Sequence, residues 1–387
     1  MKPNIFAAAL LLLIPADGWS CLPADALKPV DHLALAGPNR SEIERALSLV
    51  PAAHRTAMEF LVENMPEVDL KSLKSDYLLE NVALAFEAFD AAPWAKQVPQ
   101  DIFLNDVLPY ASLNEKRDDW RRKLRDIAAP IVKDCKTPGE AAQALNRQIF
   151  GIVKVRYSTQ RKKPDQSALE SMDSGIATCS GLSVLLVDAC RAVGVPARVA
   201  GTPMWMNLRG NHTWVEVWDG DWHFTGAAEP DKTGLDRGWF ADDASKARRD
   251  VPEHAIYASS FRKTGLSFPL VWNPRLKWVP AVNVTDRYTP TVAPIPDARL
   301  RLLVRVLGGG KRVAAKVTVT SAADATLKLE GKSSDESADL NNLLAFPVLR
   351  GQTLHLRIER DGNSIEEDVK TTTGQAAEQM VTIVIPS

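Results

Sequence analysis

Hydrophobic and polar positions divide this chain of 387 residues into three parts with different periodicities. Apolar residues recur at helical spacing in residues 31–153, which predicts a helical region. Residues 153–288 combine one strongly apolar helix with short, aromatic-rich strands. After a proline-rich stretch at 289–296, apolar and polar residues alternate, which predicts strands only. The pattern therefore predicts an α+β protein that ends in a β-domain.

Two capping boxes predict where helices begin in the helical region. Ser41 is followed three residues later by Glu44, and Thr137 is followed by Glu140 at the same spacing. In such a box the hydroxyl and the carboxylate satisfy backbone N–H groups that have no partner within the helix. Pro138 takes the first helical position, where its missing N–H does no harm.

The first twenty residues are predicted to be a secretory signal peptide. Lys2 supplies a positive start, and the apolar run Ile5–Ile14 is shorter than the roughly 20 residues that span a bilayer. Gly18 and Ser20 are small residues at the spacing that a signal peptidase reads. We therefore expect an exported protein that is periplasmic, secreted or attached to the cell surface. Cys21 stands where a lipid-modified cysteine would be, so a lipoprotein is an alternative, and membrane attachment is expected only in that case.

Composition and length limit the possible partners of the protein and the number of its domains. The 47 basic and 48 acidic side chains give a net charge of −1, so no basic field is available for nucleic acid. A chain of this length usually forms more than one domain. The predicted units are a signal peptide at 1–20, a helical region at 21–140, a central α+β domain at 141–288, a linker at 289–296 and a β-sandwich at 297–387. The last unit resembles immunoglobulin-like and carboxypeptidase-regulatory-like modules.

Cys179 begins the strongest helix of the central domain. Thr178 is its predicted N-cap, Gly194 ends the helix and Pro196 prevents its continuation. One apolar stripe runs along this helix through Leu182, Leu185, Leu186, Ala189 and Val193. The N-terminus of a helix stabilises a thiolate and offers N–H groups to an oxyanion. Cys179 is therefore a candidate nucleophile, with a structural cysteine as the alternative.

The other cysteines give no comparable signal. Cys190 lies on the apolar stripe and reads as a small buried residue. It cannot pair with Cys179, because eleven helical residues separate the two by roughly 16 Å. Cys135 has no obvious partner, although a bond to Cys21 stays open. No cluster of cysteine and histidine has the spacing of a zinc site, and a site built from Cys179, His212 and His223 lacks any recognised spacing, so no metal is expected.

His212 begins a predicted aromatic strand at residues 211–218. Asp219 and Gly220 form a turn, and residues 221–225 return as the partner strand of a hairpin. A single histidine on a strand is usually structural, but one that follows a cysteine-headed helix and an intervening strand is much rarer. Glu216 lies about 13 Å along the strand from His212, so we interpret it as structural.

Together these residues resemble the transglutaminase-like superfamily, whose core is a papain-like α+β unit. The family pattern is a cysteine that opens a helix, a Gly-[Ile/Val]-Pro-Ala-Arg turn, a His-x-Trp-x-Glu-Val strand and a tryptophan followed by an acidic residue and proline. This chain supplies Cys179, residues 194–198, residues 212–217, Trp222 and the pair Glu229-Pro230. The resemblance covers about residues 141–240 and does not extend to the N-terminal helical region.

The resemblance implies a cysteine-headed helix packed on an antiparallel sheet and an enzyme without a cofactor. Cys179 would attack a carbonyl of a protein, peptide or other amide substrate, and His212 would act as general base. The thioester would then be resolved by water or by a second amine, which leaves hydrolase and acyltransferase both open. The family usually has Asp-Pro soon after the tryptophan, whereas this longer loop has Glu229 before Pro230. Glu229 is therefore the predicted third catalytic residue, and Asp231 is the alternative.

Three further residues are candidates by location. Gln166, Trp205 and Trp214 are candidate oxyanion donors or substrate contacts, with core packing as the alternative for both tryptophans. Residues 237–240 are expected to pack near the site. The competing functional hypothesis is a non-catalytic module that uses the same fold for binding or scaffolding at the cell surface. The presence of both Cys179 and His212 favours the enzyme.

Overall fold

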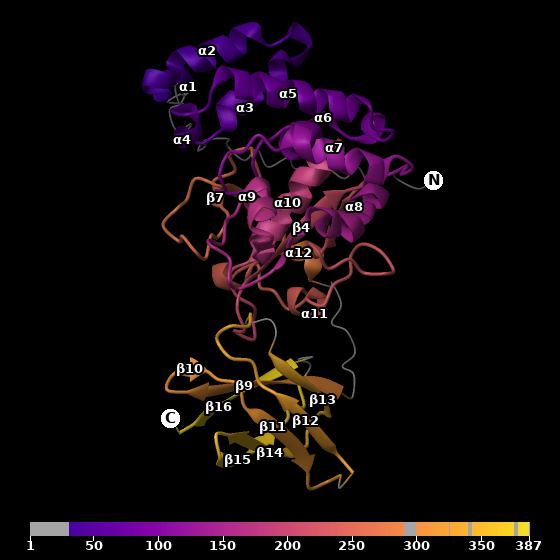
Figure 1. Cartoon of the computed structure of the whole chain (residues 1–387), viewed down its shortest axis with the longest axis vertical. Coiled ribbons are helices and arrows are strands. Elements are labelled where there is room, and N and C mark those ends of the chain that lie inside the picture. Colours follow the sequence, from indigo (N-terminus) through magenta and orange to yellow (C-terminus); the bar gives the residue numbers. More distant parts are fainter. Residues whose placement is uncertain (1–30, 290–298, 325, 340–342, 375–377, 387) are drawn as a thin grey trace, which may run out of the picture.

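The computed structural model describes residues 31–289, 299–324, 326–339, 343–374 and 378–386. Figure 1 shows three stacked parts: helices at the N-terminal end, a mixed α/β part in the middle and a β-sandwich at the other end. The predicted α+β fold class is therefore confirmed. The predicted signal peptide, Cys21 and all but the first residue of the predicted linker lie outside the described residues. Within the described ranges, the search for a helix long and apolar enough to cross a membrane finds none.

Helices α1–α8 form the N-terminal part and continue into the central part. They are α1 (His32–Leu35), α2 (Arg40–Leu49), α3 (Arg55–Asn64), α4 (Glu67–Leu70), α5 (Ser75–Asp90), α6 (Gln100–Asp106), α7 (Arg121–Val132) and α8 (Pro138–Val153). The capping box predicted at Ser41 is wrong, because a 3₁₀ turn over Gly37–Asn39 leads directly into α2 at Arg40. The box at Thr137 is confirmed as an N-cap, since its hydroxyl accepts the backbone N–H of Glu140.

An antiparallel sheet of six strands, in the order β5-β4-β3-β6-β8-β7, lies in the central part. Its strands are β3 (Ala197–Thr202), β4 (His212–Trp218), β5 (Trp222–Thr225), β6 (Tyr257–Ser259), β7 (Leu266–Ser267) and β8 (Pro280–Asn283). The remaining elements here are β1 (Arg156–Tyr157), β2 (Ile176–Ala177), α9 (Ala168–Ser174), α10 (Cys179–Ala192), α11 (Ala241–Ala244) and α12 (Thr285–Tyr288). Strands β4 and β5 pair around the predicted turn, so the predicted hairpin is confirmed.

The two faces of this sheet bury different cores. Val199, Val215 and Val217 belong to the large core shared with the helices. Ala200 and Trp214, which lie one residue away and face the other side, belong to a second, aromatic-rich core. This alternation places the start of β4 between an apolar helix on one face and a group of aromatic rings on the other.

Helix α10 is buried along its length and connects the central sheet to the N-terminal helices. Every residue from Ser180 to Ala192 is buried. At its C-terminal end Arg191 donates to the Ala111 carbonyl at 3.0 Å, and Arg121 of α7 donates to the Arg191 carbonyl at 3.1 Å. The boundary predicted between residues 140 and 141 falls inside α8, which spans Pro138–Val153. Both α7 and α8 pack on α10 and share its core.

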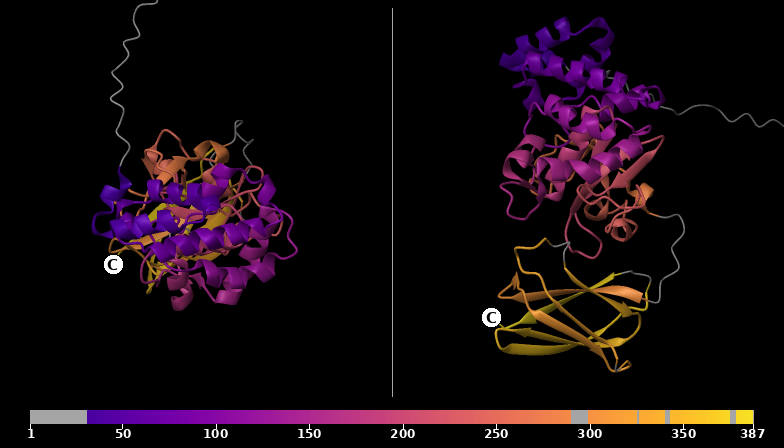
Figure 2. Two further views of the ribbon diagram at one scale, coloured as in Figure 1. Left: turned by 90° about the horizontal axis from the view of Figure 1, so that it is seen from above. Right: turned by 45° about the vertical axis from the view of Figure 1, so that its right-hand side comes forward.

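The C-terminal part consists of two four-stranded sheets packed face to face (Figure 2). One contains β10 (Lys311–Arg312), β9 (Arg299–Gly308), β13 (Leu344–Leu349) and β16 (Glu378–Ile385), and the other contains β12 (Lys328–Lys332), β11 (Lys316–Ser321), β14 (Thr353–Arg360) and β15 (Asn363–Lys370). Alternate residues of β14, namely Leu354, Leu356 and Ile358, are buried in the core between the sheets, as their sequence pattern predicts.

A buried ionic group joins the β-sandwich to the central part. Arg209, only 1% exposed, forms a short ion pair with Asp243 and lies 3.6 Å from the carboxylate of Glu378 on β16. Asn207 donates to both carboxylates, at 2.9 and 3.1 Å. Arg301 of β9 pairs with the other oxygen of Glu378 at 2.6 Å. These contacts fix the sandwich against the loop that precedes β4.

Replacing Arg209 by alanine is expected to destabilise the protein strongly. The change leaves the buried carboxylates of Asp243 and Glu378 without the cation between them, which costs about 3 kcal/mol of unfolding free energy. Urea unfolding followed by tryptophan fluorescence measures the loss. Arg248→Ala, which breaks an exposed ion pair with Asp250, is the matched control and should cost less than about 1 kcal/mol. Equal losses in the two variants would contradict the structural role of this group.

Candidate active site

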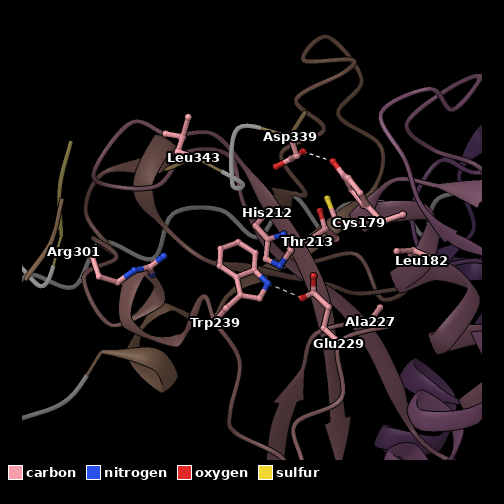
Figure 3. A pocket seen from close by; sticks show the side chains of 11 residues that line it. Cys179, Leu182, His212, Thr213, Ala227, Glu229, Trp239, Arg301, Asp339 and Leu343 are labelled. Carbon is pink, nitrogen blue, oxygen red and sulfur yellow. Dashed lines mark hydrogen bonds between the residues drawn. The ribbon is translucent and has the colours of Figure 1, made fainter. Parts of the chain in front are cut away.

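Cys179 and His212 line one cavity of about 430 Å³, a volume typical of small-molecule and side-chain binding sites. Figure 3 shows the two side chains directed into it. Its described lining residues are Tyr157, Cys179, Leu182, His212, Thr213, Ala227, Glu229, Trp239, Arg301, Asp339 and Leu343. The cavity therefore lies where α10, the start of β4 and the β-sandwich meet.

The N-cap of α10 holds Cys179 in place. The Thr178 hydroxyl accepts the Gly181 N–H at 2.9 Å and donates to the Pro164 carbonyl at 2.7 Å, which confirms the predicted cap. The hydroxyl of Ser180 lies 3.0 Å from that of Thr213, and this hydrogen bond ties the first turn of the helix to β4. Cys179 is half-buried and is not part of a disulfide.

Burial keeps the Cys179 thiol protonated in this structure. Desolvation raises its pKa to about 11, and the charge of Asp339 acts in the same direction. Hydrogen bonds from the backbone and side chain of Thr213, and from the backbone of Ser180, oppose the shift without cancelling it. The raised pKa favours the neutral thiol among the two protonation schemes that the sequence left open.

Aromatic rings enclose the imidazole of His212. The Trp239, Phe240 and Trp214 rings lie 4.7, 5.0 and 5.8 Å from it, centroid to centroid. The residue is 5% exposed, and within the described parts of the chain neither ring nitrogen has a hydrogen-bond partner. Burial lowers its pKa to about 3, against the opposing charge of Asp339 and with a further decrease from Arg209. The neutral imidazole has one ring nitrogen that can accept a proton, and its low pKa makes it a weak base in this state.

Glu229 lies in the cavity but does not bind the imidazole. Its carboxylate accepts the indole N–H of Trp239 at 2.7 Å, and that indole packs on His212. Desolvation raises the pKa of Glu229, although the residue as a whole is exposed. Asp231 is placed away from the cavity, where its exposed carboxylate accepts the N–H and hydroxyl of Thr233 at 2.7 and 2.6 Å.

The three further candidates do not line the cavity as it is defined by the described residues. Gln166 uses its amide N–H groups to bind Ser174 and the Ile176 carbonyl, at 2.9 and 3.1 Å. Trp214 donates its indole N–H to Tyr288 at 2.8 Å. Trp205 is buried and stacks on Trp214, with 5.9 Å between the rings. Both tryptophans therefore pack in the aromatic-rich core, the alternative that the sequence left open.

Eight of the eleven described lining residues were not singled out as site residues from sequence, and four of them are polar or aromatic residues close to the reacting groups. Thr213 contacts the sulfur and stands between two motif residues, so its position was a usable signal. Trp239 falls in the segment 237–240 that was expected to pack near the site, and it does. Tyr157 and Asp339 had no local signal, because a hydrogen bond joins them across 182 residues of sequence.

The arrangement brings a thiol and an imidazole to one cavity. Within the described residues, no group of three or more histidine, cysteine or acidic side chains is placed to hold a metal ion. A thiol and an unpaired imidazole in one cavity can exchange a proton and attack an electrophilic carbonyl.

Glu216 is confirmed as structural, since it pairs with Arg198 at 2.6 Å and accepts the Tyr288 hydroxyl at 2.8 Å.

Two solved structures are similar to parts of the chain. One is a protein from Cytophaga hutchinsonii proposed to be a cysteine protease, with 20% identity, a TM-score of 0.27, and 36% of this chain and 46% of that chain covered. The other is red sea bream transglutaminase, with 9% identity, a TM-score of 0.32, and 73% and 66% covered. The chain thus spans about half of the first protein and just under two thirds of the second.

The comparison with curated proteins finds no match. Residues 125–244 match the transglutaminase-like superfamily. The match begins in α7, ends in α11 and includes Cys179, His212 and Glu229. These 120 residues therefore form a domain of the transglutaminase-like superfamily.

Proposed function

We propose that this protein is a cysteine enzyme that transfers or hydrolyses acyl groups of protein, peptide or other amide substrates through a thioester on Cys179. One observation carries the proposal: the thiol at the head of α10 and the unpaired, buried imidazole of His212 line the same cavity. A structural cysteine and a structural histidine need neither a shared cavity nor unpaired ring nitrogens. The superfamily match over residues 125–244 adds support.

The proposed reaction starts from a neutral pair. His212 accepts the proton of the Cys179 thiol as the sulfur attacks the substrate carbonyl, and the backbone N–H of Cys179 donates to the developing oxyanion. The C–N bond breaks, His212 protonates the departing amine, and the acyl group stays on the sulfur as a thioester. Water or a second amine then attacks the thioester and gives its proton to His212. This cycle returns the thiol and the neutral imidazole.

Glu229 is proposed as the acidic residue that supports His212, acting through Trp239. The Glu229 carboxylate accepts the indole N–H, and the indole packs on the imidazole, so the pair fixes the orientation of the ring. Glu229 is therefore a positioning residue in this proposal. Asp231 caps its own turn and is not supported for this role.

Export belongs to the same proposal and rests on the first twenty residues alone. A charged start followed by ten apolar residues is typical of a signal peptide. The protein would then meet its substrates in the periplasm, at the cell surface or outside the cell, with membrane attachment only if Cys21 is lipidated. Nucleic acid is not a proposed partner.

Loss of turnover in two variants tests the proposal. We expect casein turnover to vanish in Cys179→Ala and to fall at least about a thousandfold in His212→Ala, because nucleophile and base act as one unit. Cys135→Ala and His223→Ala are matched controls outside the cavity and should keep wild-type turnover. Adding a labelled primary amine to the same assay separates transfer from hydrolysis. Wild-type turnover in Cys179→Ala would contradict the thioester on Cys179. Absence of turnover in the unmodified protein would support the non-catalytic binding module instead.

A second test uses the low pKa of His212. This pKa, about 3 in the folded protein against about 6.5 in an unfolded chain, means that the unfolded state binds more protons between these values. Acidification from about pH 7 to about pH 5 therefore lowers the unfolding free energy, by about 1–2 kcal/mol through this residue. His212→Gln should lose that much less than the wild type in urea unfolding at the two pH values. His223→Gln, at a half-exposed position, should follow the wild type. Equal pH effects in wild type and His212→Gln would contradict a buried neutral imidazole.

A further inference from the structure

The β-sandwich contributes three residues to the cavity that holds Cys179. Asp339, Leu343 and Arg301 line it together with residues of the central domain. In Figure 3 the carboxylate of Asp339 stands on the same side of the cavity as Cys179. The superfamily match ends at residue 244, so these residues lie outside it. Recognition at this site therefore depends on a part of the chain that the family resemblance does not describe.

Contacts to both domains hold the Asp339 segment in place. The hydroxyl of Tyr157 donates a short hydrogen bond to the Asp339 carboxylate, and the hydroxyl of Thr159 donates one to the Ser337 carbonyl. From within the sandwich, the guanidinium of Arg312 donates to the Ala338 carbonyl at 2.6 Å. These hydrogen bonds hold the Asp339 carboxylate in place at the cavity.

The charge of Asp339 acts on the reacting groups. It raises the pKa of both Cys179 and His212, and all three side chains line the same cavity, so a substrate held there would meet this carboxylate. The hydroxyl of Tyr157 that donates to Asp339 is an uncharged donor. Glu229 adds a second carboxylate to the lining. Arg301 brings a positive charge to the lining, but its guanidinium is paired with Glu378 at 2.6 Å.

We propose that Asp339 is a specificity-determining residue that selects acyl donors carrying an ammonium or guanidinium group near the carbonyl attacked by Cys179. This inference rests on the proposed function and names the substrate class of the same site. The indole of Trp239 and the phenol of Tyr157 line the same space and offer aromatic faces on which a cation is stabilised. His212 is buried, and neither of its ring nitrogens has a hydrogen-bond partner among the described residues, so both are available to a bound substrate.

The cation belongs to the acyl donor and not to the attacking amine. A carboxylate stabilises the protonated form of a nearby amine, and an ammonium group has no lone pair with which to attack a thioester. Asp339 next to the sulfur would therefore slow an amine acceptor that bound it directly. The same charge stabilises a cation of the donor that takes no part in the reaction.

Charged thiol reagents test this selection. We would measure the rates at which trimethylammonioethyl methanethiosulfonate (cationic) and sulfonatoethyl methanethiosulfonate (anionic) modify Cys179 in the full chain, read by peptide mass spectrometry and divided by their rates with free cysteine. The expected cation-to-anion ratio is about tenfold in the wild type and falls at least about threefold in Asp339→Asn. Asp335→Asn is the matched control, because it removes one charge from the same segment outside the cavity lining and keeps an oxygen for the Ser337 N–H.

A binding measurement keeps this inference separate from the proposed function. In the Cys179→Ala chain, calorimetry should show tighter binding of Nα-acetyl-lysinamide than of Nα-acetyl-norleucinamide, and the difference should disappear with Asp339→Asn. Failure of the proposed function would appear as turnover that survives Cys179→Ala, and it would not change this comparison. Equal binding of the two amides, or a preference for the cation that survives Asp339→Asn, would overturn the inference. So would a charge ratio in Asp339→Asn equal to that in Asp335→Asn.

Discussion

Helix α10 is buried between α7 and α8 on one side and strands β3 and β4 on the other, and this packing fixes where its first residue lies. Apolar contacts along the helix determine its position. The Thr178 cap and the hydrogen bond between Ser180 and Thr213 then place the sulfur next to the first residues of β4. The same burial determines the chemistry. It raises the pKa of the thiol and lowers that of the imidazole, which favours the neutral pair from which the proposed reaction starts.

The β-sandwich contributes residues to the cavity that holds Cys179 and His212. Its Glu378 shares the buried group around Arg209, and the guanidinium of Arg209 also lies 5.1 Å from the ring of Trp239, which packs on His212. A chain of contacts thus leads from the interface between the domains to the imidazole. Asp339 enters the cavity from the same domain. We therefore view the two domains as one functional unit.

Local patterns in the sequence were enough for much of the fold and for the two side chains, Cys179 and His212, that line one cavity. The helix headed by Cys179, its Thr178 cap and the strand that begins at His212 were each predicted from neighbouring residues, and the structure confirms all three. The predictions that failed or stayed incomplete depend either on a neighbouring turn or on distant contacts. Ser41 does not cap its helix because the preceding turn already starts it. The neutral thiol requires knowledge of burial, and Asp339 reaches Tyr157 across 182 residues, which no local pattern indicates.

Trapping the thioester tests the central claim most directly. The protein is incubated with casein, quenched in acid and digested, and the peptide that contains Cys179 is weighed by mass spectrometry. The account predicts an added acyl mass on Cys179 that hydroxylamine removes and that does not form in His212→Ala. Turnover of casein without any adduct on Cys179, or an adduct on Cys135 instead, would contradict it.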